Sequence, residues 1–216
     1  GPAGENLVAY ANVMTGVKNA GGRTGMGAVM GSKNLKAVSC RGTMDVKITH
    51  PMEALEYNKK FIEQITGAKV NQTQGTLGTP FIWGATNSWG GVRTENFRYN
   101  PLEYADDIEP ERIDEIATET MGPYHMAGCF GCQVHCRAQY KIPSGKYKGK
   151  YDEGPEYTSQ GAFGAEVGCR SAETVLAGNH LVDQFGMDNL ETGSMIAWAM
   201  ECFEEGLITK EQADGI

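Results

Sequence analysis

Apolar residues recur at helical spacing in the second half of the chain, and this pattern predicts a mostly helical body from about residue 50. Thr49, His50 and Pro51 should open the first helix, because proline fits the first helical turn. Gly206 should follow the last helix at the C′ position, where glycine is favoured. The predicted helices span Met52–Ile65, Glu109–Thr120, Ala172–Phe185 and Thr192–Glu205.

In two of these helices, the spacing of the apolar residues predicts which side is apolar. In the first helix, one face carries Leu55, Phe61 and Ile65. In the last helix, the side that is predicted to face inward carries Ile196, Ala199, Met200 and Phe203.

The remaining segments are less regular. We expect a short helix near Leu7–Met14 and strands at Leu35–Cys40 and Val46–Ile48. Residues 67–100 contain many Gly and Asn residues, which interrupt any periodicity and predict a loop-rich surface. Residues 141–152, KIPSGKYKGKYD, predict a basic hairpin or loop. Together these elements predict an α+β fold that is mostly helical.

Composition narrows the possible classes of protein. With 216 residues, the chain can form one or two domains with a hydrophobic core. Its short apolar runs exclude a membrane span, and its net charge of -8 disfavours nucleic-acid binding. The first residues, GPAGENLV, lack the pattern of a secretory signal. These features suit a cytoplasmic enzyme, and we expect both ends of the sequence to be cuts inside a longer protein.

Three of the six cysteines lie within eight residues, in the segment CFGCQVHC at residues 129–136. Clustered thiols in a chain without signs of secretion favour metal binding over a disulfide. Because thiolates bind soft metals and iron–sulfur clusters, Cys129, Cys132 and Cys136 are predicted to hold three corners of a [4Fe-4S] cluster. A fourth ligand must come from elsewhere, and Cys169 is the best candidate within this sequence.

Two alternatives for the same segment remain open. Zinc would use His135 as a fourth ligand, although His135 and Cys136 are adjacent and converge poorly on one tetrahedral site. The other alternative is a set of simple buried thiols. Cys40, Cys169 and Cys202 are isolated and are predicted to be small buried apolar residues. The histidines lack metal-ligand spacing and are predicted to be structural: His50, His125, His135 and His180.

The segment GGRTGMGAVMGSK at residues 21–33 is rich in glycine and carries two cations. Glycines let backbone N–H groups approach an anion closely, and Arg23 and Lys33 would add positive charge. The segment lacks the Gly-Lys pair of a Walker A loop, and Met30 interrupts a G-x-G-x-x-G dinucleotide motif. It therefore predicts either contact with a phosphate or a structural turn.

Two further segments place carboxylates at turns. The segment DQFGMD, residues 183–188, ends a predicted helix with Gly186 at the C′ position. Its aspartates can accept hydrogen bonds from a heterocycle, or they can simply cap the next helix. The segment DEGPEY, residues 152–157, holds Glu153 and Glu156 on either side of a Gly-Pro pair. One of these glutamates is a candidate general base, and the alternative is a solvated turn.

In their order and spacing, these motifs resemble the aldehyde:ferredoxin oxidoreductase family over nearly the whole chain. Family chains are much longer, so most of an N-terminal β domain and a C-terminal helical domain would lie outside this sequence. Residues 1–48 would be the end of a pterin-binding α/β domain, and residues 49–216 a helical domain. The segments that carry the resemblance are GPAGEN (1–6), AGGRTGMGAVMGSKNLKAV (20–38), NSWGGVRTENF (87–97), CFGCQVHC (129–136), EGPEY (153–157) and DQFGMDNLETGSMIAWAMECFEEGL (183–207).

The resemblance implies a tungsten (or molybdenum) atom between two pterins, an Mg²⁺ ion that links the pterin phosphates, and a nearby [4Fe-4S] cluster. Three cluster ligands would be Cys129, Cys132 and Cys136, with a fourth cysteine beyond this sequence. Glu156 would lie near the metal, and a catalytic histidine would lie outside this sequence. Residues implied to bind the pterins are Arg23, Gly25, Gly27, Asp183, Gly186, Met187 and Asp188.

At two positions the sequence departs from the family pattern. Met187 replaces a leucine in the motif that contacts a pterin. Arg93 replaces a proline in a segment that shapes the substrate channel, which leaves the choice of aldehyde open.

The implied reaction is the oxidation of an aldehyde to a carboxylic acid, with electrons passing through the cluster to ferredoxin or another electron-transfer protein. Glu156 would activate water or orient the aldehyde. A related possibility is the tungsten subunit of a benzoyl-CoA type aromatic-ring reductase, which would need partner subunits. A third is a non-enzymatic electron-transfer or zinc-binding module. We expect a homo-oligomer or a subunit of a larger complex.

Overall fold

The computed structural model describes residues 1–215 and shows an α+β fold that is mostly helical, as the sequence predicts. No helix among these residues has both the length and the apolar character needed to cross a membrane. The α-helices are α1 (Pro2–Glu5), α2 (Met26–Ser32), α3 (Pro51–Gly67), α4 (Lys69–Leu77), α5 (Trp83–Ser88), α6 (Pro110–Met121), α7 (Tyr157–Phe163), α8 (Ala172–Phe185) and α9 (Asn189–Glu204). Short 3₁₀ helices are η1 (Thr79–Ile82), η2 (Ala105–Ile108) and η3 (Ala165–Val167).

Two small antiparallel sheets accompany the helices. Strands β1 (Val13–Met14) and β2 (Ala20–Gly21) form a hairpin near the N-terminus. A second sheet has the order β3 (Met126–Ala127), β4 (Arg137–Lys141) and β5 (Tyr151–Glu153). Its β3–β4 connection contains the three clustered cysteines, and its β4–β5 connection is the basic hairpin that the sequence predicts. The second sheet thus connects the cysteines directly to the carboxylates at the end of β5.

The body has two hydrophobic clusters that share α8 as their common wall. Val175 and Val182 of α8 face the first cluster, while Leu176 faces the second. Because α8 has apolar residues on both sides, it is held between the α5–α7 region and the α6–β4 region. The first cluster also contains Trp83, Val92, Leu102, Ile108 and Phe163, and the second contains Ile113, Ile116, Tyr140 and Ile142.

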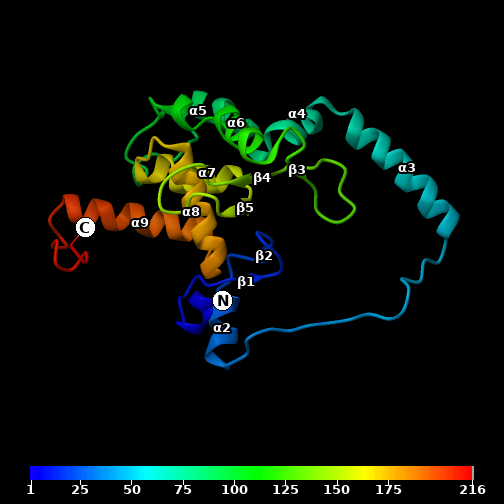
Figure 1. Ribbon diagram of the computed structural model, residues 1–216, viewed down its shortest axis with the longest axis horizontal. Coiled ribbons are helices and arrows are strands. Elements are labelled where there is room, and N and C mark those ends of the chain that lie inside the picture. The colour runs from blue at the N-terminus through cyan, green and yellow to red at the C-terminus, as the bar shows by residue number, and fades with distance from the viewer. Residues whose placement is uncertain (216) are drawn as a thin grey trace.

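The N-terminal helices approach each other through glycine. A Cβ atom on Gly31 of α2 would lie 1.8 Å from the Gly4 oxygen, and one on Gly4 would lie 2.6 Å from the Gly27 oxygen. Since these neighbours are backbone atoms, no side-chain movement can make room. Figure 1 shows this N-terminal part, in blue, below the body and next to the end of α8.

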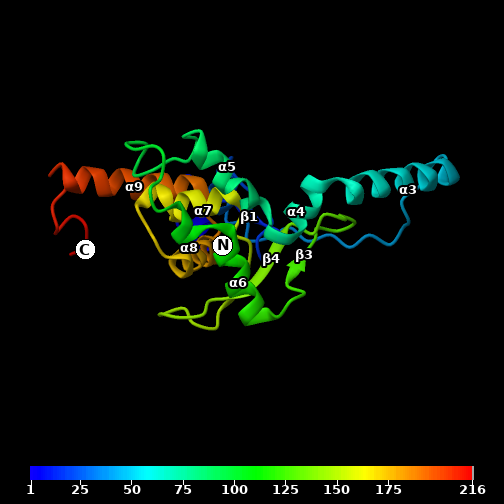
Figure 2. The ribbon, with the colours of Figure 1, turned by 90° about the horizontal axis from the view of Figure 1, so that it is seen from above.

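Helix α3 projects away from the body as an arm. Figures 1 and 2 show it at one end of the molecule, joined to α2 by a long extended segment. The predicted apolar face is present on this helix, but Leu55, Phe61 and Ile65 remain 48%, 56% and 36% exposed. No residue of α3 is buried.

The first 48 residues differ from the sequence prediction. Leu7 has a positive φ of 57°, which ends α1 and prevents a helix over Leu7–Met14. That segment instead bridges to the end of α8 and starts the β1–β2 hairpin. The strands predicted at Leu35–Cys40 and Val46–Ile48 are also wrong, because both segments are exposed and pair with no strand among residues 1–215.

Two further predictions are corrected in the helical body. Residues 67–100 contain α4 and α5 in addition to loops, so the loop-rich prediction is wrong for residues 69–88. In α9, Ile196, Met200 and Phe203 are 43–45% exposed, and Ala199 is half-buried. The buried side of α9 consists instead of Thr192, Gly193, Ala197 and Cys202. Small side chains let α9 pack closely on α7, where a Cβ on Gly193 would lie 2.6 Å from that of Ala162.

Candidate cofactor pocket and cysteine loop

A pocket of about 240 Å³ collects residues from five separate parts of the chain. Its walls come from the β1–β2 hairpin and the loop after it, the end of β5, α7, α8 and the start of α9. Four residues predicted from the sequence line this pocket: Arg23, Glu156, Asp183 and Asp188. The remaining lining residues are Lys18, Glu153, Thr158, Ser159, Asn179, Asn189 and Leu190.

The Asp183–Asp188 turn is held in place by the N-terminal segment. Gly186 has a φ of 74° and ends α8 as predicted, with its N–H donating to the Val182 oxygen at 2.9 Å. The Asn12 N–H donates to the Gly186 oxygen at 2.9 Å, and its side-chain amide donates to the Met187 oxygen at 2.9 Å. Met187 itself packs against the first hydrophobic cluster, so its side chain supports the turn.

Asp183 is a buried carboxyl to which few neighbouring groups donate hydrogen bonds. Burial raises the pKa of Asp183 to about 8, helped by the charges of Asp152 and Glu153 and opposed by Lys18. Among residues 1–215, its side-chain hydrogen-bond partner is the Asn179 amide, which donates to Oδ2 at 3.3 Å. The group can therefore form hydrogen bonds to the N–H groups of a heterocycle, in either protonation state.

Asp188 and Arg23 both line the pocket near the start of α9. Asp188 is the N-cap of α9, and its Oδ1 accepts from the Glu191 N–H at 2.8 Å. Arg23 makes an ion pair with Glu191 at 3.6 Å and keeps a side chain that is 61% exposed. Its guanidinium is thus available to a charged group that enters the pocket. Lys33 is exposed and does not line this pocket.

Two glycines of the 21–33 segment allow the backbone to pack closely against residues 9–12 of the same chain. Gly25 has a φ of 68°, and a Cβ there would lie 2.4 Å from the Ala9 oxygen. A Cβ on Gly27 would lie 2.4 Å from the Asn12 oxygen. Gly27 and Gly186 border a second hollow of about 700 Å³, which Asp183 also borders. Pterin contact by Gly25 and Gly27 stays a prediction, and the structural turn is sufficient to explain both glycines.

The two candidate glutamates have different partners. Glu153 is buried and accepts from Tyr151 at 2.8 Å, and it pairs with Arg137 at 3.0 Å. Glu156 forms an ion pair with Lys18, and its other oxygen accepts from the Thr79 hydroxyl at 2.5 Å. Both glutamates line the pocket, but the Glu156 side chain is 34% exposed against 10% for Glu153.

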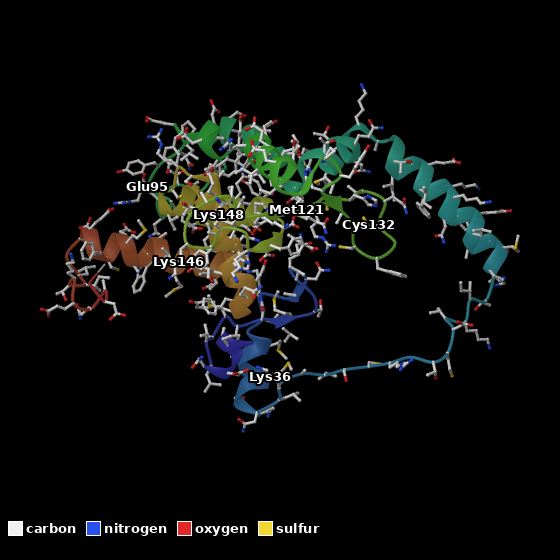
Figure 3. All side chains as sticks on the ribbon, viewed as in Figure 1. Lys36, Glu95, Met121, Cys132, Lys146 and Lys148 are labelled. Atoms are coloured by element: carbon white, nitrogen blue, oxygen red, sulfur yellow. The ribbon has the colours of Figure 1, made fainter. Side chains whose placement is uncertain are left out.

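Residues 128–136, which we term the cysteine loop, connect β3 and β4. All three cysteines are free thiols, and the Cys132 N–H donates to the Cys129 oxygen at 3.0 Å. Gly131 and His135 adopt positive φ values of 73° and 53°, so the loop turns sharply twice. Figure 3 shows Cys132 on this loop, which extends from the small sheet toward the side of the molecule where α3 lies.

The three clustered thiols do not converge on a position for a single ion. Among residues 1–215, no three His, Cys, Asp or Glu side chains surround a position for a single ion. Tetrahedral zinc needs its ligands to converge at about 2.0–2.3 Å from one centre. A cubane instead binds each thiolate at a different iron, so its cysteines stand farther apart. Ligation by Cys129, Cys132 and Cys136 stays a prediction.

The isolated cysteines and the histidines have separate environments. Cys202 is buried, as predicted, whereas Cys40 is exposed and Cys169 is half-buried. Cys169 lies near Ser171, to whose oxygen its thiol donates at 3.7 Å, and does not line the pocket. His180 pairs with the buried Asp152 at 2.7 Å, which supports its structural assignment.

The sequence analysis missed three residues of the site because none of them belongs to a recognisable motif. Lys18 reaches the pocket from an exposed hairpin, Thr79 comes from η1, and Asn179 comes from the middle of α8. Their positions depend on contacts between distant segments. Asn179 alone had a usable signal, because a polar residue in the middle of an apolar helix face indicates a buried partner.

Two family sequence models match the chain. The one described as "Aldehyde ferredoxin oxidoreductase, N-terminal domain" matches residues 1–42, and the one described as "Aldehyde ferredoxin oxidoreductase, domains 2 & 3" matches residues 56–216. The chain therefore belongs to the aldehyde ferredoxin oxidoreductase family.

Curated relatives agree with this assignment. A tungsten-containing aldehyde ferredoxin oxidoreductase of Pyrococcus abyssi is 36% identical over 218 residues, covering 100% of this chain and 34% of the relative. That of Thermococcus kodakarensis is 34% identical, over 98% of this chain and 34% of the relative. An "Aliphatic sulfonate oxidoreductase, WOR-like subunit" of Pyrococcus furiosus is 30% identical, over 98% and 33%. The chain thus spans about a third of the length of these relatives.

Proposed function

We propose that this chain is part of an enzyme that oxidises aldehydes to carboxylic acids at a tungsten bis-pterin centre and passes the electrons through a [4Fe-4S] cluster to ferredoxin. The balance is one aldehyde and one water giving one acid, two protons and two electrons. The observation that carries the proposal is the 240 Å³ pocket, which joins Arg23, Asp183, Asp188 and Glu156. The relatives named as tungsten-containing aldehyde oxidoreductases support the same reaction.

Individual residues of the pocket can bind separate groups of a heterocyclic cofactor that carries a phosphate. Asp183 and Asp188 would hold the ring N–H and amino groups of a pterin, and Arg23 would bind its phosphate. Cys129, Cys132 and Cys136 would bind the cluster, and Mg²⁺ would neutralise the pterin phosphates. When bound, the tungsten centre supplies the two-electron redox chemistry, for which the protein provides orientation and electrostatics.

Glu156 is the proposed catalytic carboxylate. It forms an ion pair with Lys18, and as a carboxylate it can accept a proton from water or a hydrogen bond from a hydrated aldehyde. Thr79 fixes the second oxygen and also accepts from the Tyr157 N–H at 2.8 Å, so the side chain is tied to the start of α7. Glu153 is bound to Arg137 and Tyr151, and we assign it a structural role.

Substitution of each glutamate in the full-length protein tests this proposal. Glu156→Gln keeps size and removes the charge, so tungsten and iron contents should persist while aldehyde turnover falls by about 10²–10⁴-fold. Glu153→Gln is the matched control and should keep most turnover in whatever protein folds. If turnover survives in Glu156→Gln and collapses in Glu153→Gln, Glu153 is the catalytic carboxylate. If the wild-type protein contains tungsten but oxidises no aldehyde, the proposed reaction is wrong.

A further inference from the structure

Asn179 is a buried amide in the middle of α8, and it lines the same pocket as Asp183, which lies one helical turn further along. The residue is only 3% exposed. Its amide carries two donor hydrogens and one acceptor oxygen, and a buried group of this kind costs free energy when it is left unpaired. Its hydrogen-bond partners therefore indicate its role.

The partners of Asn179 come from three elements besides its own helix. Its Nδ2 donates to the Tyr140 hydroxyl of β4 and to the backbone oxygen of Glu153 in β5, both at 3.2 Å. Its Oδ1 accepts from the Asn189 amide of α9 at 3.2 Å, and that amide also donates to Ser159 of α7 at 2.6 Å. Asn179 thus links β4, β5 and α9 directly, and α7 through Asn189.

The fourth contact of Asn179 is to the Asp183 carboxyl. Nδ2 donates to Oδ2 of Asp183 at 3.3 Å. If the amide were reversed, its oxygen would face the Glu153 carbonyl oxygen, so the network favours the orientation in which the NH₂ group points at Asp183. Because the contact is to Oδ2, the other oxygen of Asp183 stays available to a ligand in the pocket.

The titratable groups around Asp183 act on its charge but do not set its direction. They come from β4, β5 and the β1–β2 hairpin: Tyr140, Asp152, Glu153 and Lys18. The ammonium group of Lys18 pairs with Glu156 instead. A Coulomb interaction has no preferred angle, whereas a hydrogen bond does. The Asn179 amide is therefore the neighbour that can orient the carboxyl.

We propose that Asn179 is a positioning residue that sets the orientation of the Asp183 carboxyl for a heterocycle bound in the pocket. The inference rests on the proposed function for the identity of that heterocycle, a pterin. A carboxyl held at one oxygen presents the other in a fixed direction, whereas a free one rotates about its broad terminal torsion. Asn179 also ties this direction to the neighbouring elements, since its amide contacts β4, β5 and α9.

The rate of pterin release from the full-length holoprotein tests the proposal, followed by the fluorescence of the oxidised pterin. Asn179→Leu keeps a similar volume and removes the donors, so release should become about 10–100-fold faster. Gln160→Leu is the matched control. Gln160 is a fully buried amide of α7 that donates to the Ile108 oxygen and does not line the pocket. Its loss should lower the stability of the protein but leave the release rate near that of the wild type.

A second measurement needs no cofactor. In the full-length protein without cofactor, ¹³C NMR of the aspartate carboxyl carbons follows the titration of Asp183, which Asp183→Asn assigns. A donated hydrogen bond favours the ionised form of a carboxyl, so Asn179→Leu should raise the pKa of Asp183 above its value of about 8. Gln160→Leu should leave that pKa unchanged. If Asn179→Leu does not fold, Asn179→Ala, which removes the donors without adding bulk, takes its place in both measurements.

The proposal is overturned if the variant at position 179 releases pterin no faster than Gln160→Leu, or if the titration of Asp183 stays the same. A double-mutant cycle gives a third criterion. If Asn179 acts through Asp183, adding Asn179→Leu to Asp183→Asn should not speed release further, and effects that multiply would contradict the positioning role. If the wild-type holoprotein contains no pterin but the titration shifts as expected, the proposed function fails while the positioning role stands.

Discussion

The helical body and the α3 arm carry sequence patterns of the same kind, yet they bury very different amounts of surface. Val175 and Leu176 of α8 are both fully buried between two clusters. In α3 the equivalent apolar positions, Leu55 and Phe61, are about half exposed at 48% and 56%. An amphipathic pattern therefore specifies which face of a helix favours burial. Whether burial occurs depends on a partner surface elsewhere in the fold.

The same contrast holds for the ends of the helices. Helix α8 begins at Ser171, whose hydroxyl accepts from the Thr174 N–H at 3.2 Å, and α9 begins at the Asp188 cap. Helix α3 begins at His50, which makes no side-chain capping bond. Helices α8 and α9 of the pocket are thus fixed by both packing and caps, whereas the arm relies on proline and local propensity. Substitutions in both regions test how far this difference extends.

The largest difference is expected between two aromatic truncations. Trp83 is 1% exposed, donates from Nε1 to the Ala105 oxygen at 3.0 Å, and packs edge-on against Tyr157. Trp83→Ala should lower the free energy of unfolding by about 3–5 kcal/mol, since it leaves a large cavity. Phe61→Ala in the arm should change it by less than about 0.5 kcal/mol. Urea denaturation measures both, and equal losses would mean that α3 is packed in solution.

The next difference concerns glycines. Gly27→Ala should lower the free energy of unfolding by about 1–3 kcal/mol, because its Cβ would meet the Asn12 and Ala11 backbone. A Cβ on Gly67, the last residue of α3, would have no atom within 4 Å, so Gly67→Ala should raise helix content without global destabilisation. Circular dichroism and urea denaturation separate the two effects. A stable Gly27→Ala protein would contradict the close contact between α2 and the Ala11–Asn12 backbone.

The sequence predicted the helices whose boundaries are encoded locally. Pro51, Ser171 and Gly186 mark helix ends through chemistry that acts within a few residues, and α3 and α8 were placed almost correctly. Helix α4 was missed because it contains Gly75, which usually disfavours a helix. That glycine has a tertiary reason, because a Cβ there would lie 2.7 Å from the Val134 oxygen of the cysteine loop. No local pattern reports such a contact.

For the site as well, the sequence predicted residues that belong to local motifs and missed those that depend on tertiary contacts. Arg23, Glu156, Asp183 and Asp188 belong to motifs, and the structure brings them to one pocket although they are far apart in the sequence. Lys18 belongs to no motif that the sequence analysis used. Its inward direction results from the hairpin geometry and from the carboxylate it meets, and both exist only in the folded chain.

A buried carboxyl of the body should make stability depend on pH. The pKa of Asp183 is about 8 in the folded chain against an ordinary value of 3.8, so between these values the folded state holds a proton that the unfolded state has lost. Stability should therefore fall as pH rises from about 4 to about 8, by at most about 1.4 kcal/mol per pH unit. Asp183→Asn removes this titration and should flatten the slope in urea denaturation of the cofactor-free protein. Parallel curves for the two proteins would contradict the raised pKa.

The smallest expected effect compares the two helix caps. Asp188→Ala removes the acceptor for the Glu191 N–H at the start of α9 and should cost about 1 kcal/mol. Asp188→Asn keeps a side-chain oxygen at that position and should retain most of the stability, which separates capping from charge. His50→Ser introduces a cap at α3, but because α3 buries no residue it should change global unfolding by less than about 0.5 kcal/mol. If His50→Ser stabilised the protein as much as Asp188→Ala destabilised it, the arm would unfold together with the body, and the contrast between them would not hold in solution.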